Sequence, residues 1–258
     1  MTRYLFSEWD EIKKRLQKAD RLLLLLDYDG TLAPIASIPQ AARLPLENRR
    51  ALRQLVKRPQ CRVGVVSGRS LSETRDMVGV RGLILSGNHG LEIQGAGLRF
   101  SFPGGTVQKQ LMNRLANALI PALKKLPGVW VEDKKFTLSI HYRLMPEKLT
   151  GQLRKLCGKT VRQTTRDADV CLCKGKKVLE IRPTNRWNKG LAISWIKAQI
   201  KPTLTLYVGD DVTDRDAFQA LAPDDIAIRV GPSHATAAPY FLKNQAETND
   251  LLGRLATL

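Results

Sequence analysis

The sequence predicts a doubly wound α/β domain, and three short apolar runs support that prediction. Leu22–Leu26, Arg62–Val66 and Leu204–Val208 have the length and composition of strands that a parallel sheet buries on both faces. Segments with helical patterns follow them, so strands and helices alternate along the chain. This alternation is typical of a parallel α/β core.

The remaining core elements follow in order along the chain. Glu47–Lys57 is predicted to be a helix because its apolar residues recur at helical spacing. The other predicted strands are Leu83–Leu85 and Ile226–Val230. The other predicted helices are Leu71–Met77, Leu191–Lys201, Ala217–Leu221 and Asn249–Leu258, with an amphipathic helix over Met1–Arg21.

A different pattern begins after Pro103-Gly104-Gly105, which reads as a domain boundary. Helices are predicted over Val107–Lys125 and Pro146–Cys157. Strands are predicted over Val129–Glu132, Phe136–Tyr142, Asp169–Cys173 and Val178–Ile181. Helices with antiparallel hairpins indicate a small α+β lid, or cap. We therefore expect a core domain of residues 1–102 and 184–258 and an inserted cap of residues 103–183.

Composition limits the classes of protein. No apolar run approaches the ~20 residues of a membrane span, and the charged N-terminal segment does not resemble a signal peptide. The four cysteines include no Cys-x-x-Cys pair, which argues against zinc and for free thiols. We expect a cytoplasmic protein with no membrane contact, and a monomer.

The net charge of +18 is compatible with nucleic acid, an anionic surface or an anionic substrate. Residues 103–183 carry 17 Lys and Arg against 6 Asp and Glu, so the cap is the more basic part. A solvated basic surface is the simplest alternative. Only 6% of residues are aromatic and no stacking motif is present, which argues against nucleic acid.

Two carboxylates, Asp27 and Asp29, follow the first strand, and Gly30 allows a sharp turn after them. Ligands bind at the carboxyl ends of strands in such sheets. A carboxylate there can hold Mg²⁺ or attack phosphorus, and a second acid can protonate a leaving alcohol. The alternative is an ordinary Asp-Gly turn.

Three further polar groups fall at the ends of predicted elements. The Ser67 hydroxyl in Val-Val-Ser-Gly-Arg can hold a phosphoryl oxygen, and Lys189 in Trp-Asn-Lys-Gly can neutralise its charge. Carboxylates crowd together in Gly209-Asp210-Asp211-Val212-Thr213-Asp214, where a cation would relieve their repulsion.

These four motifs, in this order, resemble those of haloacid dehalogenase-type phosphatases. The narrower resemblance is to trehalose-6-phosphate phosphatases, and it covers about residues 22–230. It is carried by Ser86–Ile93, Leu179–Pro183, Trp187–Gly190 and Gly209–Phe218. It implies a Rossmann-like hydrolase core, Mg²⁺ as cofactor and hydrolysis of trehalose 6-phosphate.

The resemblance also implies roles for individual residues. Asp27, Asp29, Ser67 and Lys189 would be catalytic, and Asp27, Asp29 (through its backbone carbonyl), Asp210 and Asp214 would hold the metal. Asn88, His89, Glu132, Arg143, Lys176 and Glu180 would bind substrate. For each cap residue a surface ion pair is the alternative.

Other readings remain open from the sequence. The core motifs suit a phosphatase for another sugar phosphate, such as sucrose phosphate or glucosylglycerol phosphate, equally well. A basic nucleic-acid-binding protein is a more distant alternative. One departure from the family pattern is Arg215, where family members often have Glu. It puts local charge and substrate identity in question.

Overall fold

The computed structural model describes residues 2–36, 38–165, 170–175, 177–184, 187–210, 214–231 and 237–258. The chain forms two compact units. Unit 1 comprises Met1–Phe100 with Trp187–Leu258, and unit 2 comprises Ser101–Arg186. The two units are described separately below.

Unit 1 is built on a nine-stranded sheet in the order β1-β13-β12-β11-β2-β3-β4-β5-β6. Along this order, every neighbouring pair from β1 through β13, β12, β11, β2 and β3 to β4 is parallel. Strand β5 pairs antiparallel with β4. Their bounds are Arg3–Tyr4 (β1), Leu22–Leu26 (β2), Cys61–Val66 (β3), Ile84–Gly87 (β4), Glu92–Gly95 (β5), Leu98–Ser101 (β6), Leu204–Gly209 (β11), Ile226–Val230 (β12) and Tyr240–Leu242 (β13).

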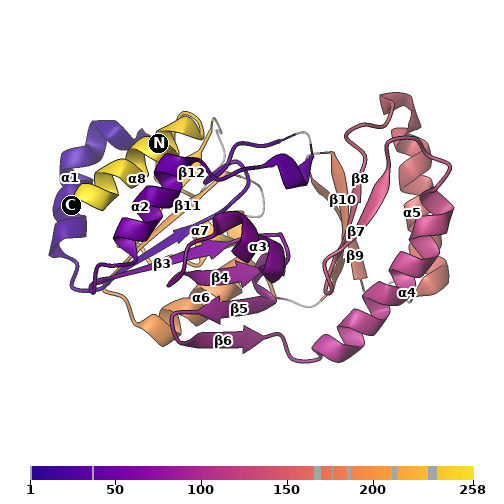
Figure 1. Cartoon of the computed structure of the whole chain (residues 1–258), viewed down its shortest axis with the longest axis horizontal. Coiled ribbons are helices and arrows are strands. Elements are labelled where there is room, and N and C mark those ends of the chain that lie inside the picture. The colour runs from indigo at the N-terminus through magenta and orange to yellow at the C-terminus, as the bar shows by residue number, and fades with distance from the viewer. Residues whose placement is uncertain are drawn as a thin grey trace. The chain divides into compact units, whose positions relative to one another are not determined.

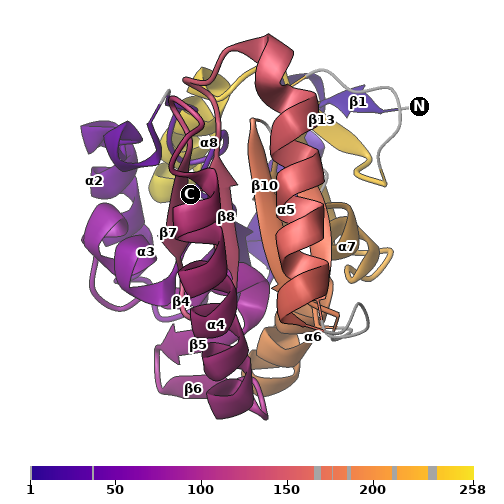
Figure 2. The ribbon, with the colours of Figure 1, turned by 90° about the vertical axis from the view of Figure 1, so that its right-hand side faces the viewer.

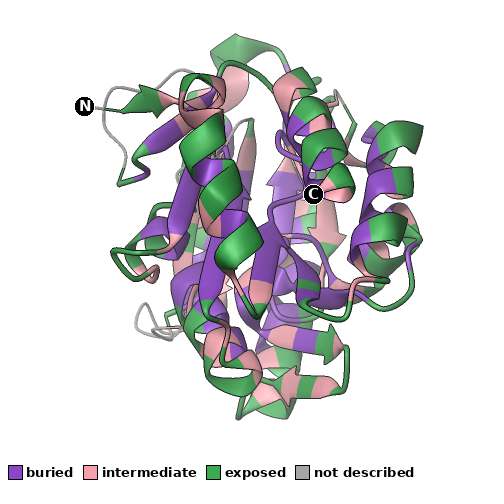
Figure 3. Ribbon diagram, turned by 90° about the vertical axis from the view of Figure 1, so that its left-hand side faces the viewer, coloured by how far each residue is buried: buried purple, intermediate pink, exposed green. Residues whose placement is uncertain are grey.

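Helices cover both faces of this sheet, which confirms the predicted α/β class. Their apolar residues belong to two clusters, one with α1, α2, α3 and α8 and the other with α6 and α7. The bounds are Trp9–Lys18 (α1), Leu46–Leu55 (α2), Leu71–Val78 (α3), Lys189–Ile200 (α6), Asp214–Gln219 (α7) and Ala246–Thr257 (α8). In Figure 3 the strands at the centre of unit 1 are mostly buried, whereas α1 and α2 expose their outer faces.

The central strand β2 shows why the five leucines form a strand. Leu24 and Leu26 point into one apolar cluster, and Leu23 and Leu25 point into the other. All four are fully buried. Successive strand residues face opposite sides of a sheet, so a continuous apolar run fits a strand covered on both faces.

The N-terminal prediction is wrong in part. The helix expected over Met1–Arg21 is confined to Trp9–Lys18, and it is preceded by β1 and a 3₁₀ turn over Leu5–Glu8. Strand β1 adds to the edge of the sheet beside β13. This pairing depends on residues more than 200 positions away, so local periodicity gives no sign of it.

Unit 2 contains a four-stranded antiparallel sheet in the order β7-β8-β10-β9. Helices α4 and α5 lie side by side against one of its faces (Figure 2). The bounds are Gly105–Leu123 (α4), Trp130–Asp133 (β7), Leu138–His141 (β8), Thr150–Thr164 (α5), Val170–Gly175 (β9) and Val178–Pro183 (β10). Leu138, Ile140, Leu179 and Ile181 face the helices, so the other sheet face carries their polar strand neighbours.

Figure 1 labels most of these elements. None of the helices in the described parts of the chain is both long and apolar enough to cross a membrane.

The burial of β2 gives a stability prediction. Leu25→Ala should lower the free energy of unfolding by about 2–5 kcal/mol because it leaves a cavity beneath the sheet. Leu46 is 66% exposed at the start of α2, so Leu46→Ala should change it by no more than about 0.5 kcal/mol. Urea denaturation followed by circular dichroism measures both. Equal effects would show that β2 is not at the centre of the core.

Candidate active site

The polar motifs of unit 1 lie where its central strands end. Asp27 follows β2, Ser67 follows β3 and Asp210 follows β11. These three strands are neighbours in the order β11-β2-β3, and they run in parallel. Their carboxyl ends therefore meet at one edge of the sheet, where ligands bind in this class of fold.

The ammonium group of Lys189, the first residue of α6, is buried between two carboxylates. It donates hydrogen bonds to Asp27 Oδ1 at 2.6 Å and to Asp214 Oδ1 at 2.7 Å. The Tyr207 hydroxyl donates a further hydrogen bond to Asp214 Oδ1 at 2.7 Å. Lys189 is 3% exposed and Asp214 is fully buried, so water screens these charges weakly.

Asp27, Asp210 and Asp214 form a group of carboxylates whose oxygens lie within 4.8 Å of one another. Burial raises the pKa of Asp27 well above its ordinary value; Lys189 opposes this rise, and the two neighbouring carboxylates add to it. Burial lowers the pKa of Lys189, but the charges of Asp214 and Asp27 outweigh burial and raise it overall. One ammonium cannot balance three carboxylates, so the donor set suits a hard divalent cation.

Two glycines allow the carboxylates to come this close. Gly30 has a φ of +87°, and a Cβ at this position would lie 2.2 Å from Oδ2 of Asp210. A Cβ at Gly209 would lie 2.5 Å from Cγ of Asp214. Any larger residue would displace one of these acids. The Asp-x-Asp-Gly and Gly-Asp motifs therefore have a steric basis as well as a chemical one.

Asp29 does not belong to the group of three, because its carboxylate is paired with Arg69. The guanidinium donates from Nε to Oδ2 and from Nη2 to Oδ1, each at 2.7 Å. Arg69 also donates to the carbonyl of Pro39 at 2.8 Å and is nearly buried. Such bidentate pairs fix geometry strongly. Sequence reasoning assigned no role to Arg69, although it is the last residue of the Ser-Gly-Arg turn.

Ser67 and the loop after β4 form the rest of this region. The Ser67 hydroxyl accepts a hydrogen bond from the Arg69 amide at 3.1 Å, and the Ser67 carbonyl accepts one from the His89 amide at 2.9 Å. Asn88 donates to Glu92 at 3.1 Å. Asn88 and His89 both have positive φ angles, 51° and 56°. Two adjacent residues of this kind store strain, which is typical of functional loops.

Two of the four cap residues named from the sequence, Glu132 and Glu180, lie on the polar face of the unit 2 sheet. Glu132 of β7 and Glu180 of β10 are both paired with Ser139 of β8, which lies between them. Lys134 Nζ lies 3.9 Å from a carboxylate oxygen of each. His141 Nε2 lies 2.7 Å from Glu132, so Lys134 and His141 are candidate site residues that sequence reasoning missed. The alternating pattern of this hairpin is the signal that could have found them.

The other positions named from the sequence are less informative. Arg143 is exposed beyond the end of β8, and Lys176 lies outside the described residues. Arg215 is exposed on α7, so the departure at this position affects the surface of unit 1 and not its buried carboxylates. Trp130 stacks on His141, with ring centroids 4.0 Å apart.

The fold and the carboxylates at the ends of β2 and β11 define the haloacid dehalogenase class. The sequence model of the trehalose-phosphatase family matches residues 25–246, so the chain belongs to the trehalose-phosphatase family. This confirms the resemblance drawn from the motifs.

Individual relatives agree with this assignment. A trehalose-phosphate phosphatase of Mycobacterium marinum is 33% identical over 92% of this chain and 62% of its own length. Trehalose-phosphate phosphatase B of Arabidopsis thaliana is 30% identical over 92% of this chain and 67% of its own length. The C-terminal domain of the C. albicans trehalose-6-phosphate phosphatase has a TM-score of 0.84 at 26% identity, covering 100% of this chain and 99% of that one. The chain thus spans about 62% of the M. marinum relative.

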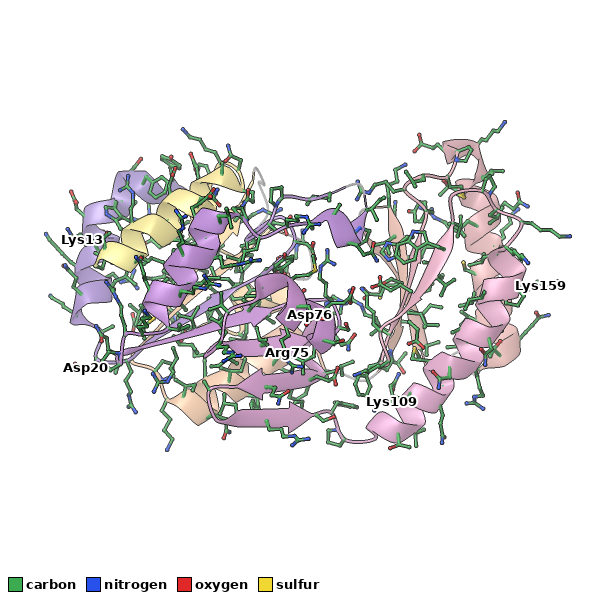
Figure 4. All side chains as sticks on the ribbon, in the orientation of Figure 1. Lys13, Asp20, Arg75, Asp76, Lys109 and Lys159 are labelled. Carbon is green, nitrogen blue, oxygen red and sulfur yellow. The ribbon has the colours of Figure 1, made fainter. Side chains whose placement is uncertain are left out.

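The buried lysine gives a second prediction. Lys189→Met removes the ammonium and leaves two buried carboxylates without it, which should cost about 3–5 kcal/mol of stability. Lys13 projects from α1 into solvent (Figure 4), so Lys13→Met should cost no more than about 0.5 kcal/mol. Thermal and urea unfolding compare the two variants. A Lys189→Met protein as stable as Lys13→Met would contradict the proposed charge balance.

Proposed function

We propose that this chain is a Mg²⁺-dependent phosphatase that hydrolyses trehalose 6-phosphate to trehalose and phosphate through an aspartyl-phosphate. The observation that carries the proposal is the contact of Lys189 with Asp27 at the end of the central strand, beside Asp210 and Asp214. Membership of the trehalose-phosphatase family supports the choice of substrate. A monomeric, cytoplasmic enzyme is part of the same proposal.

In the first step, Asp27 attacks phosphorus in line with the departing sugar oxygen. The P–O bond to the sugar breaks, and its electron pair stays with the sugar oxygen, which Asp29 protonates. Lys189 holds the Asp27 carboxylate in place and neutralises negative charge on the phosphoryl group. The Ser67 hydroxyl and nearby backbone N–H groups bind the phosphoryl oxygens.

In the second step, Asp29 acts as a base and takes a proton from water, which attacks phosphorus and releases phosphate from Asp27. Asp27, Asp210, Asp214 and the backbone carbonyl of Asp29 would hold Mg²⁺, which when bound would offset the charge of these carboxylates and of the phosphate.

The role of Asp29 requires a change from the arrangement in the structure. Both of its carboxylate oxygens accept hydrogen bonds from Arg69, so neither is free to contact the sugar oxygen. Asp29 must therefore leave Arg69 before it can protonate the sugar oxygen. Arg69 would then be a positioning residue, which holds Asp29 until a substrate binds.

Unit 2 is proposed to select the sugar. Its polar sheet face presents carboxylates at Glu132 and Glu180 with Lys134 between them, and Arg143 and Lys176 would add cationic donors. Sugar hydroxyls both donate and accept hydrogen bonds, so a face that mixes carboxylates with cations is suited to read them. The basic charge of residues 103–183 would also attract a dianionic substrate.

The direct test is phosphate release from trehalose 6-phosphate, sucrose phosphate and glucosylglycerol phosphate, with Mg²⁺ and with excess chelator. We expect trehalose 6-phosphate to be preferred, the chelator to stop turnover and Ca²⁺ to replace Mg²⁺ poorly. Asp27→Asn should abolish turnover without unfolding the protein because it removes only the nucleophilic oxygen. Turnover by this variant, or full activity in chelator, would rule the mechanism out.

The proposal that unit 2 selects the sugar and unit 1 performs the chemistry gives a further prediction. Glu132→Gln, Arg143→Ala, Lys176→Ala and Glu180→Gln should each lose about 1.5–3 kcal/mol of transition-state binding for trehalose 6-phosphate, which is roughly ten- to hundredfold in kcat/KM. An aryl phosphate lacks the sugar, so its hydrolysis should change little. Equal losses on both substrates would assign unit 2 to folding instead of recognition. No loss on either would overturn the choice of sugar.

A further inference from the structure

Two cysteines of unit 2 lie side by side on β9. Cys171 and Cys173 are two residues apart in a strand, so both side chains leave the same face of the sheet. Their Sγ atoms are 3.4 Å apart. Both residues are partly exposed, whereas Cys61 and Cys157 are buried. The strand therefore presents a pair of adjacent thiols that small solutes can reach.

This thiol pair lies beside the residues proposed to read the sugar. Glu180 of β10 is directly opposite Cys173, and Arg182 is directly opposite Cys171. Arg182 donates to Glu180 from Nε at 2.8 Å and from Nη2 at 2.5 Å. Directly paired residues share a sheet face, so the thiols, Glu180 and Arg182 form one continuous group.

A disulfide would require this pair to move closer. Two steps along a strand span about 6.6 Å, at the upper end of the range of about 4.4–6.8 Å between the Cα atoms of a disulfide. The sulfurs, now 3.4 Å apart, would have to approach to about 2.05 Å.

A metal ion that binds both sulfurs fits better. Two bonds of about 2.3 Å from one tetrahedral ion place their sulfurs about 3.8 Å apart. This separation is close to the 3.4 Å in the structure. Soft ions prefer sulfur ligands, so the site would discriminate against Mg²⁺, which prefers oxygen.

We propose that Cys171 and Cys173 form a two-sulfur site for a soft, thiophilic divalent metal ion, and that its occupation weakens sugar recognition at Glu180. On binding, two metal–sulfur bonds form, the two thiol protons pass to solvent and water leaves the ion. Water or an added ligand completes the coordination. In the described residues, Asp27, Asp210 and Asp214 are the group of three side chains placed to bind a metal, and they offer oxygen only.

Cadmium is a suitable probe because its bonds to thiolates give an ultraviolet charge-transfer band that carboxylates do not produce. The reduced 258-residue chain, in excess Mg²⁺, should develop this band and saturate at one Cd²⁺ per chain. Cys171→Ser and Cys173→Ser should each weaken binding by at least about a hundredfold, since losing even an outer partner of a metal site costs about 10- to 100-fold. Cys157→Ala, which changes a buried thiol of the same unit, is the matched control and should bind as the wild type does.

Absence of the band in the wild type, or an unchanged band in both serine variants, would overturn the site. These readouts do not involve activity, so they stand even if the proposed function fails.

The effect on recognition rests on the proposed function. Cd²⁺ should inhibit hydrolysis of trehalose 6-phosphate at least about tenfold more than that of an aryl phosphate, and Cys173→Ser should remove the difference. Equal inhibition of both substrates would place the inhibitory ion at the core carboxylates and overturn the coupling to Glu180. A wild type that hydrolyses neither substrate, yet shows the band, would refute the proposed function and leave the metal site intact.

Discussion

The buried contact of Lys189 with Asp27 and Asp214 is the interaction on which the candidate site depends. It joins the end of β2, the start of α6 and the start of α7, and the first two lie 162 residues apart in sequence. Without the ammonium, the carboxylates would repel one another in a region that water hardly reaches. The same ammonium faces the nucleophilic Asp27 in the proposed mechanism. In that mechanism, one side chain would serve both the folding of unit 1 and its chemistry.

Sequence reasoning found the long buried strands because their burial on two faces leaves a continuous apolar run. The predicted bounds of β2 and β12 match the structure, and those of β3 and β11 differ by one residue at one end. It missed β1, β5, β6 and β13, which have two to four residues each. Such short strands toward the edges of a sheet form because a partner strand is present. The local sequence pattern does not show which partner a segment will have.

The contacts of the candidate site also fall into those that the sequence could predict and those that it could not. Asp27 follows strand β2, and Lys189 and Asp214 begin helices α6 and α7, so their meeting could be inferred from the motifs and the order of the elements. The pairing of Asp29 with Arg69 could not, because the motifs do not show where the Arg69 side chain points, and a free carboxylate was equally compatible with the sequence. The contact of His141 with Glu132 depends on the exact register of a hairpin, which an alternating pattern leaves open.

The register of the unit 2 sheet also has an evolutionary consequence. On its polar face, four directly paired residues form one row across the four strands: Glu132, Ser139, Glu180 and Cys173. A point substitution can change one side chain of this polar face, while the apolar side chains on the opposite face keep the unit folded. An insertion of one residue within a strand would instead exchange the two sets of side chains and expose the core. Under the proposed role of unit 2, selection for a new sugar would therefore proceed by replacement of residues, and changes of length would be confined to the turns.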